Sequence, residues 1–361
     1  MLERIYKAQH SIDAACERLG RQINIMEVCG THTVTIFRNG IKSILPRKIK
    51  LLSGPGCPVC VTDQSYIDAV LELADHDDCL IATYGDMVRV PGKGGSLETK
   101  RTTANVRVVL SSEDALQLAK DNPQKNVVFV AVGFETTAPA TAVAVKEAAE
   151  QGINNFFVLS GHKLVVPAMR ALLSQINHNI DGFLCPGHVS AIIGYGAFAE
   201  IVEDFARPCV VAGFEPVQII EGLAEICRQI SSGEAKVKSV YAAVVTEQGN
   251  IAAQKMIAEF FQPADGCWRG LGKIGKSTLK LKDKYSRFDA FKQFAITETP
   301  GGDTTGCRCG EVLCGLIDPP QCRLFQRDCT PQTPVGPCMV SSEGACAAWF
   351  EYGRQRDERC Q

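Results

Sequence analysis

A repeated unit of strand, loop and helix dominates the sequence between residues 49 and 216. Each unit opens with a short apolar or β-branched run and continues into a loop that contains glycine or proline. The units begin at IKLLSGPGCPV, DCLIATYGDMVRVPG, NVVFVAVGFETTAPA, NNFFVLSGHKLVVPA, DGFLCPGHVSAIIG and RPCVVAGFEPVQII. Amphipathic stretches such as YIDAVLELA and AVAVKEAAE separate some of them. Strands that alternate with helices favour parallel sheets covered on both faces, so we predict an α/β protein.

Two short echoes within the sequence suggest a duplicated architecture. PGCPV at 55–59 is echoed by PGHVS at 186–190, and GFET at 133–136 by GFEP at 213–216. We interpret them as marks of two related α/β halves. The polar loops in both halves follow predicted strands, and ligands of open α/β sheets bind at that end of the strands.

The composition limits the number of domains, the classes of partner and the cellular compartment that we expect for this protein. At 361 residues and 45% hydrophobic content, the chain is long enough for two or three domains. A net charge of -2 gives no reason to expect a nucleic-acid or membrane-surface partner. The N-terminus is typical of an amphipathic helix rather than a signal peptide, so we expect a cytoplasmic protein. Because cytosolic thiols stay reduced, 17 cysteines then favour metal binding or redox chemistry over structural disulfides.

Eight of these cysteines crowd into the last 55 residues, where prolines are frequent and hydrophobic periodicity is weak. The spacing Cys309-x12-Cys322-x6-Cys329-x16-Cys346 offers four thiolates but lacks the paired Cys-x2-Cys units of zinc ribbons. We therefore predict a [4Fe-4S] cluster on these four residues, with Cys307 and Cys338 as possible replacements. The alternative is a set of unrelated buried or surface thiols.

Cys57 and Cys60 form a Cys-x-x-Cys pair after the predicted strand IKLLS and before a predicted helix. The positive end of a helix stabilises a thiolate, and a dithiol in this position can alternate with a disulfide and pass two electrons. Half of a zinc site, or two idle thiols, would give the same spacing.

Cys29 follows the apolar run INIMEV and precedes Gly30, two threonines and His32. A thiolate there could bind iron or act as a nucleophile, with His32 as its proton partner or as an outer partner of the metal site. A small cysteine packed at the end of a strand is an equally good interpretation of the residue types.

Several polar residues also follow predicted strands, and each could be functional or could cap a helix. They are Glu135, His162, His188 and Glu215, with Asp86 and Arg89 in the loop TYGDMVRVPG.

Residues 270–277 match the phosphate-loop pattern G-x4-G-K-S letter for letter. We reject a nucleotide site there, because such a loop needs a buried strand before it and a helix after it. FQPADGCWRG is not expected to form a strand, and STLKLKDKYS is a weak helix.

With these residues in view, the chain resembles the HypD family of [NiFe]-hydrogenase maturation factors over almost its whole length. The motifs CGTHT, GPGCPVC, GFETTAPA, PGHVS, GFEP, WRGLG and CTPxxPVGPCMVSSEGACAAW occur in the order of that family. The resemblance implies two Rossmann-like domains and an Fe-S domain, which we place at 1–122, 123–250 and 251–361.

The resemblance also implies a scaffold role. Proteins of this family work with the small partner HypC to carry the Fe(CN)2CO group during assembly, and HypE delivers the cyanide. Cys29 would then bind Fe(II) together with a cysteine of HypC, and Cys57 and Cys60 would relay electrons to that iron.

Two other classes remain open from the residues themselves. One is a stand-alone Fe-S thiol/disulfide oxidoreductase, and the other is a zinc-stabilised α/β binding protein without catalysis. A brown colour in an anaerobic preparation would exclude zinc, and co-purification with a HypC-like chain would favour the scaffold.

Overall fold

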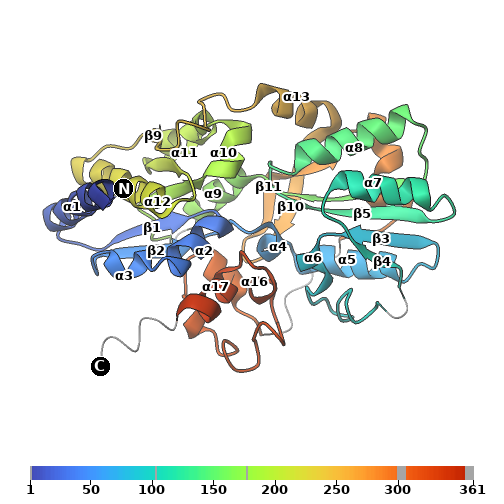
Figure 1. The fold of residues 1–361 in the computed structure, drawn as a ribbon, viewed down its shortest axis with the longest axis horizontal. Coiled ribbons are helices and arrows are strands. Elements are labelled where there is room, and N and C mark those ends of the chain that lie inside the picture. The colour runs from blue at the N-terminus through green and yellow to red at the C-terminus, as the bar shows by residue number, and fades with distance from the viewer. Residues whose placement is uncertain (1, 102–103, 176–177, 299–305, 354–361) are drawn as a thin grey trace.

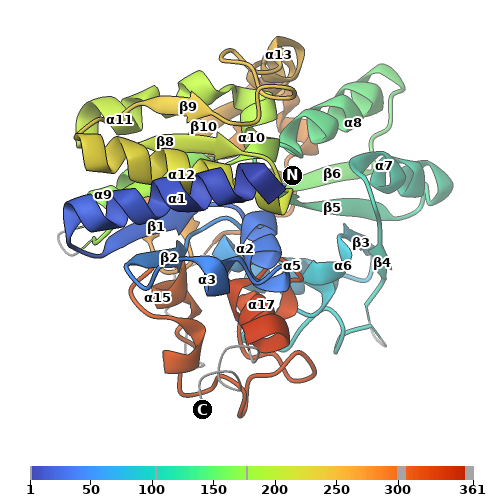
Figure 2. The same ribbon diagram turned by 60° about the vertical axis from the view of Figure 1, so that its left-hand side comes forward.

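The computed structural model describes residues 2–101, 104–175, 178–298 and 306–353. Two parallel sheets lie side by side along the long axis of the molecule, each with helices packed on it (Figure 1). The C-terminal part of the chain packs below both sheets, as the turned view also shows (Figure 2). The prediction of an α/β protein with two parallel sheets and a cysteine-rich C-terminal region is confirmed.

The first sheet has five parallel strands in the order β2-β1-β7-β8-β9. These strands are β1 (Ile23–Glu27), β2 (Ile49–Ser53), β7 (Gly182–Pro186), β8 (Cys209–Ala212) and β9 (Val237–Ser239). The apolar faces of α1 (Leu2–Leu19) and α12 (Pro216–Ser232) pack together over one face of this sheet. The other helices of this half are α2 (Gly30–Arg38), α3 (Ile41–Ile44), α10 (Gly187–Ile193) and α11 (Ala199–Phe205), with the 3-10 turn η1 (Tyr195–Phe198).

The second sheet has four parallel strands in the order β4-β3-β5-β6. They are β3 (Cys79–Thr83), β4 (Val106–Val108), β5 (Asn126–Gly133) and β6 (Phe156–His162). The run NVVFVAVG of β5 is almost fully buried, as expected for a central strand of a parallel sheet with both faces covered. The helices of this half are α4 (Pro58–Val61), α5 (Gln64–Ala74), α6 (Gly85–Val88), α7 (Ser112–Asp121) and α8 (Ala138–Glu150). The next helix, α9 (Val165–Leu173), follows β6 and packs against α11 of the first half.

A helix and an antiparallel hairpin follow the two sheets. They are α13 (Ile251–Phe260), β10 (Phe261–Trp268) and β11 (Gly272–Leu281). The expectation that FQPADGCWRG forms no strand is therefore wrong, since the pairing with β11 stabilises β10, and the weak helix expected at STLKLKDKYS is replaced by β11 and a 3-10 turn. The rejection of a phosphate loop holds, because residues 272–281, which include two of its glycines, form the strand β11 and no helix begins there.

The remaining described chain forms short helices. They are η2 (Asp283–Phe288), α14 (Ala290–Gln293), α15 (Cys309–Leu313), η3 (Pro319–Gln321), α16 (Pro337–Val340) and α17 (Ala345–Tyr352). We call residues 306–353 the C-terminal module. In the module, α15 and α16 pack against α4, while α17 packs against α2.

The sheets do not follow the predicted domain limits. The limit between residues 122 and 123 falls between α7 and β5, inside the four-stranded sheet. The five-stranded sheet takes two strands from residues 23–53 and three from residues 182–239. The chain therefore leaves the first sheet after β2, builds the second sheet, and returns to place β7 beside β1.

Over the described part of the chain, no helix is both long enough and apolar enough to cross a membrane.

Candidate functional site

A cavity of about 490 Å³ lies where the carboxyl ends of strands from both sheets meet the C-terminal module. The loops after β1, β2 and β7 of the first sheet line it, as do the loops after β3 and β5 of the second. Loops at the carboxyl ends of parallel strands are where open α/β sheets bind their ligands. The cavity is therefore the candidate functional site, and it lies between the two sheets rather than within either one.

Cys29 lines this cavity at the N-terminus of α2. Its side chain is buried, and burial raises the pKa of the thiol to about 11. The backbone N–H groups of His32 and Thr31 oppose this rise, because they favour a thiolate at the helix N-terminus, whereas the charge of Glu343 adds to it. Cys29 is thus held as a neutral thiol in a place where a bound cation would favour its thiolate form.

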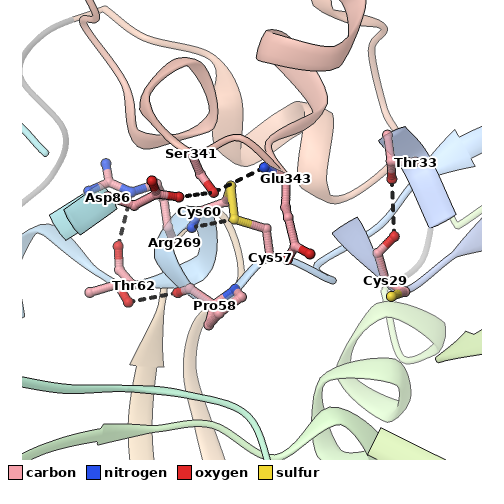
Figure 3. Close-up of a disulfide and its surroundings, with 10 residues drawn as sticks. All are labelled: Cys29, Thr33, Cys57, Pro58, Cys60, Thr62, Asp86, Arg269, Ser341 and Glu343. Carbon is pink, nitrogen blue, oxygen red and sulfur yellow. Dashed lines mark hydrogen bonds between the residues drawn. A yellow bond between two sulfur atoms is a disulfide. The ribbon is translucent and has the colours of Figure 1, made fainter. Parts of the chain in front are cut away.

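Cys57 and Cys60 form a disulfide with a Cα–Cα distance of 5.2 Å (Figure 3). Cys57 is the N-cap of α4, and its Sγ accepts a hydrogen bond from the Cys60 backbone N–H at 3.2 Å. Both side chains are almost fully buried. Asp63 caps the following helix α5, where its carboxylate accepts from the Ser65 N–H at 3.0 Å.

The disulfide loop and the Cys29 loop are in direct contact. The Gly30 N–H donates to the Gly56 carbonyl at 3.1 Å. A Cβ at position 56 would lie 2.1 Å from the Cys29 backbone nitrogen, so only glycine fits there. Because Gly56 directly precedes Cys57, this contact brings the disulfide to the wall of the cavity beside Cys29.

The C-terminal module contributes Glu343 to the same wall. The Thr31 hydroxyl donates to Glu343 Oε1 at 2.6 Å, and the Glu343 N–H donates to Ser341 Oγ at 3.3 Å. The Ser341 hydroxyl in turn donates to Asp86 Oδ2 at 2.9 Å, at the start of the second sheet's α6 (Figure 3). The module is therefore tied to one residue of each half at the edge of the cavity.

Two of the predicted histidines, His32 and His188, contact the ring of Phe214. His188 lines the cavity and stacks on Phe214 with ring centroids 3.9 Å apart. His32 is fully buried, its Nε2 lies 3.0 Å from the Gly213 carbonyl, and burial lowers its pKa to about 4. His32 is thus a neutral group that ties α2 to the loop after β8, and only His188 of the two faces the cavity.

The predicted glutamates have different surroundings. Glu135 is buried, and its Oε1 accepts the Val165 N–H at 3.0 Å at the start of α9. Burial raises the pKa of Glu135 to about 7. Glu215 is the exposed N-cap of α12, where its N–H donates to Gln218 Oε1 at 3.2 Å. His162 is buried between Thr137 and Thr141.

The cavity-wall residues that sequence reasoning missed include Glu343, Thr31 and Tyr84. Thr31 lies inside the CGTHT motif, and Tyr84 lies inside the loop TYGDMVRVPG that contains Asp86. Glu343 is remote from every predicted active loop, so no local signal pointed to the cavity. Glu27 was also missed; it is buried at the end of β1, and burial raises its pKa to about 7.

The C-terminal module gathers six cysteines, which we call the thiol cluster: Cys307, Cys309, Cys322, Cys329, Cys338 and Cys346. Cys338 interacts with Cys309 and Cys346 by side-chain hydrogen bonds, and Cys307 does so with Cys309. Cys329 interacts electrostatically with Cys346 and Cys322, and its Sγ accepts the Val335 N–H at 3.4 Å.

Two further cysteines of this region have other places. The Cys314 thiol contacts the Gly270 carbonyl at 3.5 Å. Cys360 lies outside the described residues.

The donor set of the thiol cluster fits an iron-sulfur group. Hydrogen bonding to neighbouring thiols, followed by burial, raises the pKa of Cys338, and the pKa of Cys307 rises for the same two reasons. Crowded thiols can all become thiolates only when a cation balances their charge. Soft sulfur ligands in a buried, loop-rich segment are those that iron-sulfur clusters use. The structure supplies more thiols than the four ligands that one such cluster takes.

Fold and site together define a class of protein: a two-sheet α/β protein with a buried thiol and a disulfide at a shared cavity, closed by a cysteine-rich module. The family model described as "Hydrogenase formation hypA family" (HypD) matches residues 3–353. The chain therefore belongs to the HypD family.

Curated proteins agree with this assignment. The chain is 46% identical over 340 residues to the hydrogenase maturation factor HypD of Escherichia coli strain K12, covering 94% of this chain and 91% of that protein. It is 42% identical over 349 residues to HypD of Cupriavidus necator, covering 94% and 92%. The hydrogenase expression/formation protein HupD of Azotobacter chroococcum is 42% identical over 344 residues, covering 93% and 91%.

Proposed function

We propose that this chain is a hydrogenase maturation factor that serves, together with HypC, as the scaffold on which an Fe(CN)2CO group is assembled. HypE is the proposed source of the cyanide. The observation that carries the proposal is the position of Cys29, a buried thiol on a cavity to which both sheets and the C-terminal module contribute. The proposed compartment is the cytoplasm, where the thiol cluster stays reduced until it binds iron.

In this proposal Cys29 is the ligand through which the chain holds its iron cargo. Cyanide and carbon monoxide bind well to electron-rich Fe(II), and a thiolate ligand supports that electron density. A single thiolate from this chain, completed by one from HypC, leaves the remaining positions on the iron open to the incoming ligands. The cavity volume of about 490 Å³ leaves room for the small ligands around the metal.

The disulfide supplies a redox couple beside the iron site. Two electrons and two protons convert the Cys57–Cys60 disulfide into two thiols, and the reverse change releases them. When bound, a [4Fe-4S] cluster would supply or accept single electrons. The helix α4 that carries the pair packs against α15 and α16, which carry Cys309 and Cys338, and its loop contacts Cys29. The pair therefore lies between the thiol cluster and the iron site.

For the cluster we propose Cys309, Cys322, Cys329 and Cys346 as ligands. The interactions that link Cys322, Cys329 and Cys346 support these three, while Cys307 and Cys338 both interact with Cys309 and compete with it for the fourth place. Alanine at Cys322 should abolish the visible absorbance of the anaerobic protein, and bound zinc in place of iron and sulfide would refute the cluster. Alanine at Cys309 and at Cys307, compared side by side, identifies the fourth ligand.

The decisive experiment concerns Cys29. The Cys29→Ala variant should fold, keep its cluster and bind HypC, but its complex should lack the infrared bands of cyanide and carbon monoxide. Cys16→Ala, which removes a buried thiol of α1 far from the cavity, should keep the bands. Bands of wild-type intensity in the Cys29→Ala complex would show that Cys29 does not bind the iron.

A stand-alone Fe-S thiol/disulfide oxidoreductase is the second candidate, because a disulfide packed against a thiol cluster also suits such an enzyme. Purification of the tagged chain from an anaerobic culture separates the two. Stable co-purification of a HypC-like chain supports the scaffold, whereas reduction of external disulfides by the chain alone supports the oxidoreductase.

A further inference from the structure

Glu343 stands closer to Cys29 than its distance in the sequence suggests. Thr31 lies two residues after Cys29, and its hydroxyl donates to Glu343 Oε1 at 2.6 Å. The side chain is half-buried and lines the same cavity as Cys29 and His188. A negatively charged oxygen donor from the C-terminal module is therefore present on the wall that holds the proposed iron ligand.

Gly30 makes this approach possible. A Cβ at position 30 would lie 2.6 Å from Glu343 Cβ and 3.3 Å from Glu343 Oε2. Gly30 has no positive φ angle, so its backbone conformation would accept other residues. The space is needed for Glu343: the residue after Cys29 has no side chain, and the Cβ and backbone oxygen of Glu343 take that place.

The carboxylate is held on one side only. Its Oε1 accepts from Thr31, and the chain before it is tied to Asp86 through Ser341. Among the residues that the structure describes, no hydrogen bond reaches Oε2. A half-buried carboxylate with an uncommitted oxygen, on the cavity that the Cys29 thiol also lines, offers a hard donor to a divalent transition metal next to a soft one.

We propose that Glu343 is the second ligand that this chain gives to the iron of Cys29, through a carboxylate oxygen. This inference rests on the proposed function and extends its metal site. In the chain alone, before HypC and the cyanide ligands are added, one thiolate and one carboxylate balance the charge of Fe(II). The C-terminal module then does more than hold the thiol cluster, because it completes the metal site of the α/β halves.

The test uses cobalt(II) as the probe and the anaerobic full-length chain with its cluster in place. Cobalt(II) is added stepwise, and the absorbance that thiolate-bound cobalt produces is read as the difference from the Cys29→Ala variant. We expect Glu343→Gln to weaken binding at least about tenfold, the lower end of the loss seen when an outer partner of a metal ligand is removed. Glu351→Gln, an exposed residue on α17, makes the same charge change away from the cavity and should bind like wild type.

If Glu343 only docks the C-terminal module and does not bind the metal, the cobalt affinities of the variants should follow a different pattern. A glutamine at position 343 can still accept the Thr31 hydrogen bond, whereas Ser341→Ala removes the hydrogen bond to Asp86 that docks this segment and keeps the carboxylate. If Ser341→Ala weakens cobalt binding as much as Glu343→Gln, Glu343 only docks the module, and the inference is wrong. It is equally wrong if Glu343→Gln binds cobalt as tightly as wild type.

The Cys29→Ala reference separates these results from a failure of the proposed function. If Cys29→Ala binds cobalt with the same thiolate absorbance as wild type, Cys29 is not the metal ligand and the proposed iron site fails with it. If Cys29→Ala loses the absorbance but Glu343→Gln keeps it at full affinity, the iron site stands and only the second ligand is refuted.

Discussion

Two glycines allow the loops that carry Cys29, Cys57 and Glu343 to come into contact. Gly56 lets the disulfide loop pack on the backbone of Cys29, and Gly30 leaves room for Glu343. Neither glycine has a positive φ angle, so the missing side chain rather than backbone freedom explains both. At the residue scale, the site is thus defined by close backbone approach as much as by its thiols.

Glu135 gives a pH-dependent prediction at the same scale. Burial raises the pKa of the Glu135 carboxyl in the folded protein to about 7 from its ordinary value of 4.5. The folded state then binds more protons than the unfolded state between these values, so the stabilisation present at low pH is lost as the pH rises through 7. From pH 5 to pH 8, wild type should lose about 2 to 3 kcal/mol of unfolding free energy relative to Glu135→Gln.

Denaturant unfolding of both proteins at several pH values measures this difference. Glutamine keeps an acceptor for the Val165 N–H, so the comparison isolates the charge. Glu113→Gln, at an exposed site on α7, is the control and should follow the wild-type pH dependence. A pH-independent difference between wild type and Glu135→Gln would show that Glu135 does not titrate in this range.

At the scale of elements, the short helix α4 has the most connected position. It begins beside Cys29, carries the disulfide, and packs against two helices of the C-terminal module. The Arg269 guanidinium also donates to the Thr62 carbonyl at its end at 3.1 Å, which ties the β10-β11 hairpin to the same place (Figure 3). The four residues of α4 are thus in contact with the Cys29 loop, the C-terminal module and the β10-β11 hairpin. These contacts restrain the positions of the two sulfur atoms.

We predict that the Cys57–Cys60 pair is redox-active and not needed for the fold. Cys57→Ser should keep the visible absorbance of the cluster and the melting temperature within the range of Cys267→Ser, a matched variant outside the site. The variant should nevertheless stop hydrogenase maturation. The single thiol that remains cannot form the disulfide, so the pair can no longer take up or release two electrons. Mass spectrometry of the alkylated wild-type protein, before and after reduction, should show the pair changing state. Normal maturation by Cys57→Ser would refute the relay role.

At the scale of the whole molecule, the C-terminal module connects the two halves. Phe37 of α2 and Trp349 of α17 have ring centroids 4.9 Å apart, and the Lys42 ammonium lies over both rings. On the other half, the Arg89 guanidinium donates to the Pro331 carbonyl at 2.5 Å. The module is therefore attached to both sheets, and the cavity keeps its shape only while both attachments hold.

This arrangement predicts that Trp349→Ala loosens the module. Loss of the aromatic pair and of the cation–π contact should destabilise its docking by about 2 kcal/mol, and the rate of limited proteolysis in residues 306–353 should rise about thirtyfold. Glu351→Ala, on the exposed side of the same helix, should be cleaved at the wild-type rate. Equal cleavage of wild type and Trp349→Ala would show that this contact does not hold the module.

The α/β fold class could be predicted from sequence because it depends on local patterns. Buried strands such as NVVFVAVG are apolar and β-branched, and the loops after them carry glycine, so β5 and its neighbours were found where they were expected. The β10 strand was missed for the opposite reason. FQPADGCW has little apolar periodicity, and its pairing with β11 stabilises it.

The sequence by itself determined the fold class, the family and the thiols at Cys29, Cys57 and Cys60, since chemistry-bearing motifs are short and contiguous. Only the tertiary structure decided which strands share a sheet, that His188 rather than His32 faces the cavity, and that Glu343 joins Cys29 there. These facts depend on packing between segments up to 312 residues apart, as with Thr31 and Glu343. The burial of apolar faces selects such contacts, and no local pattern records them.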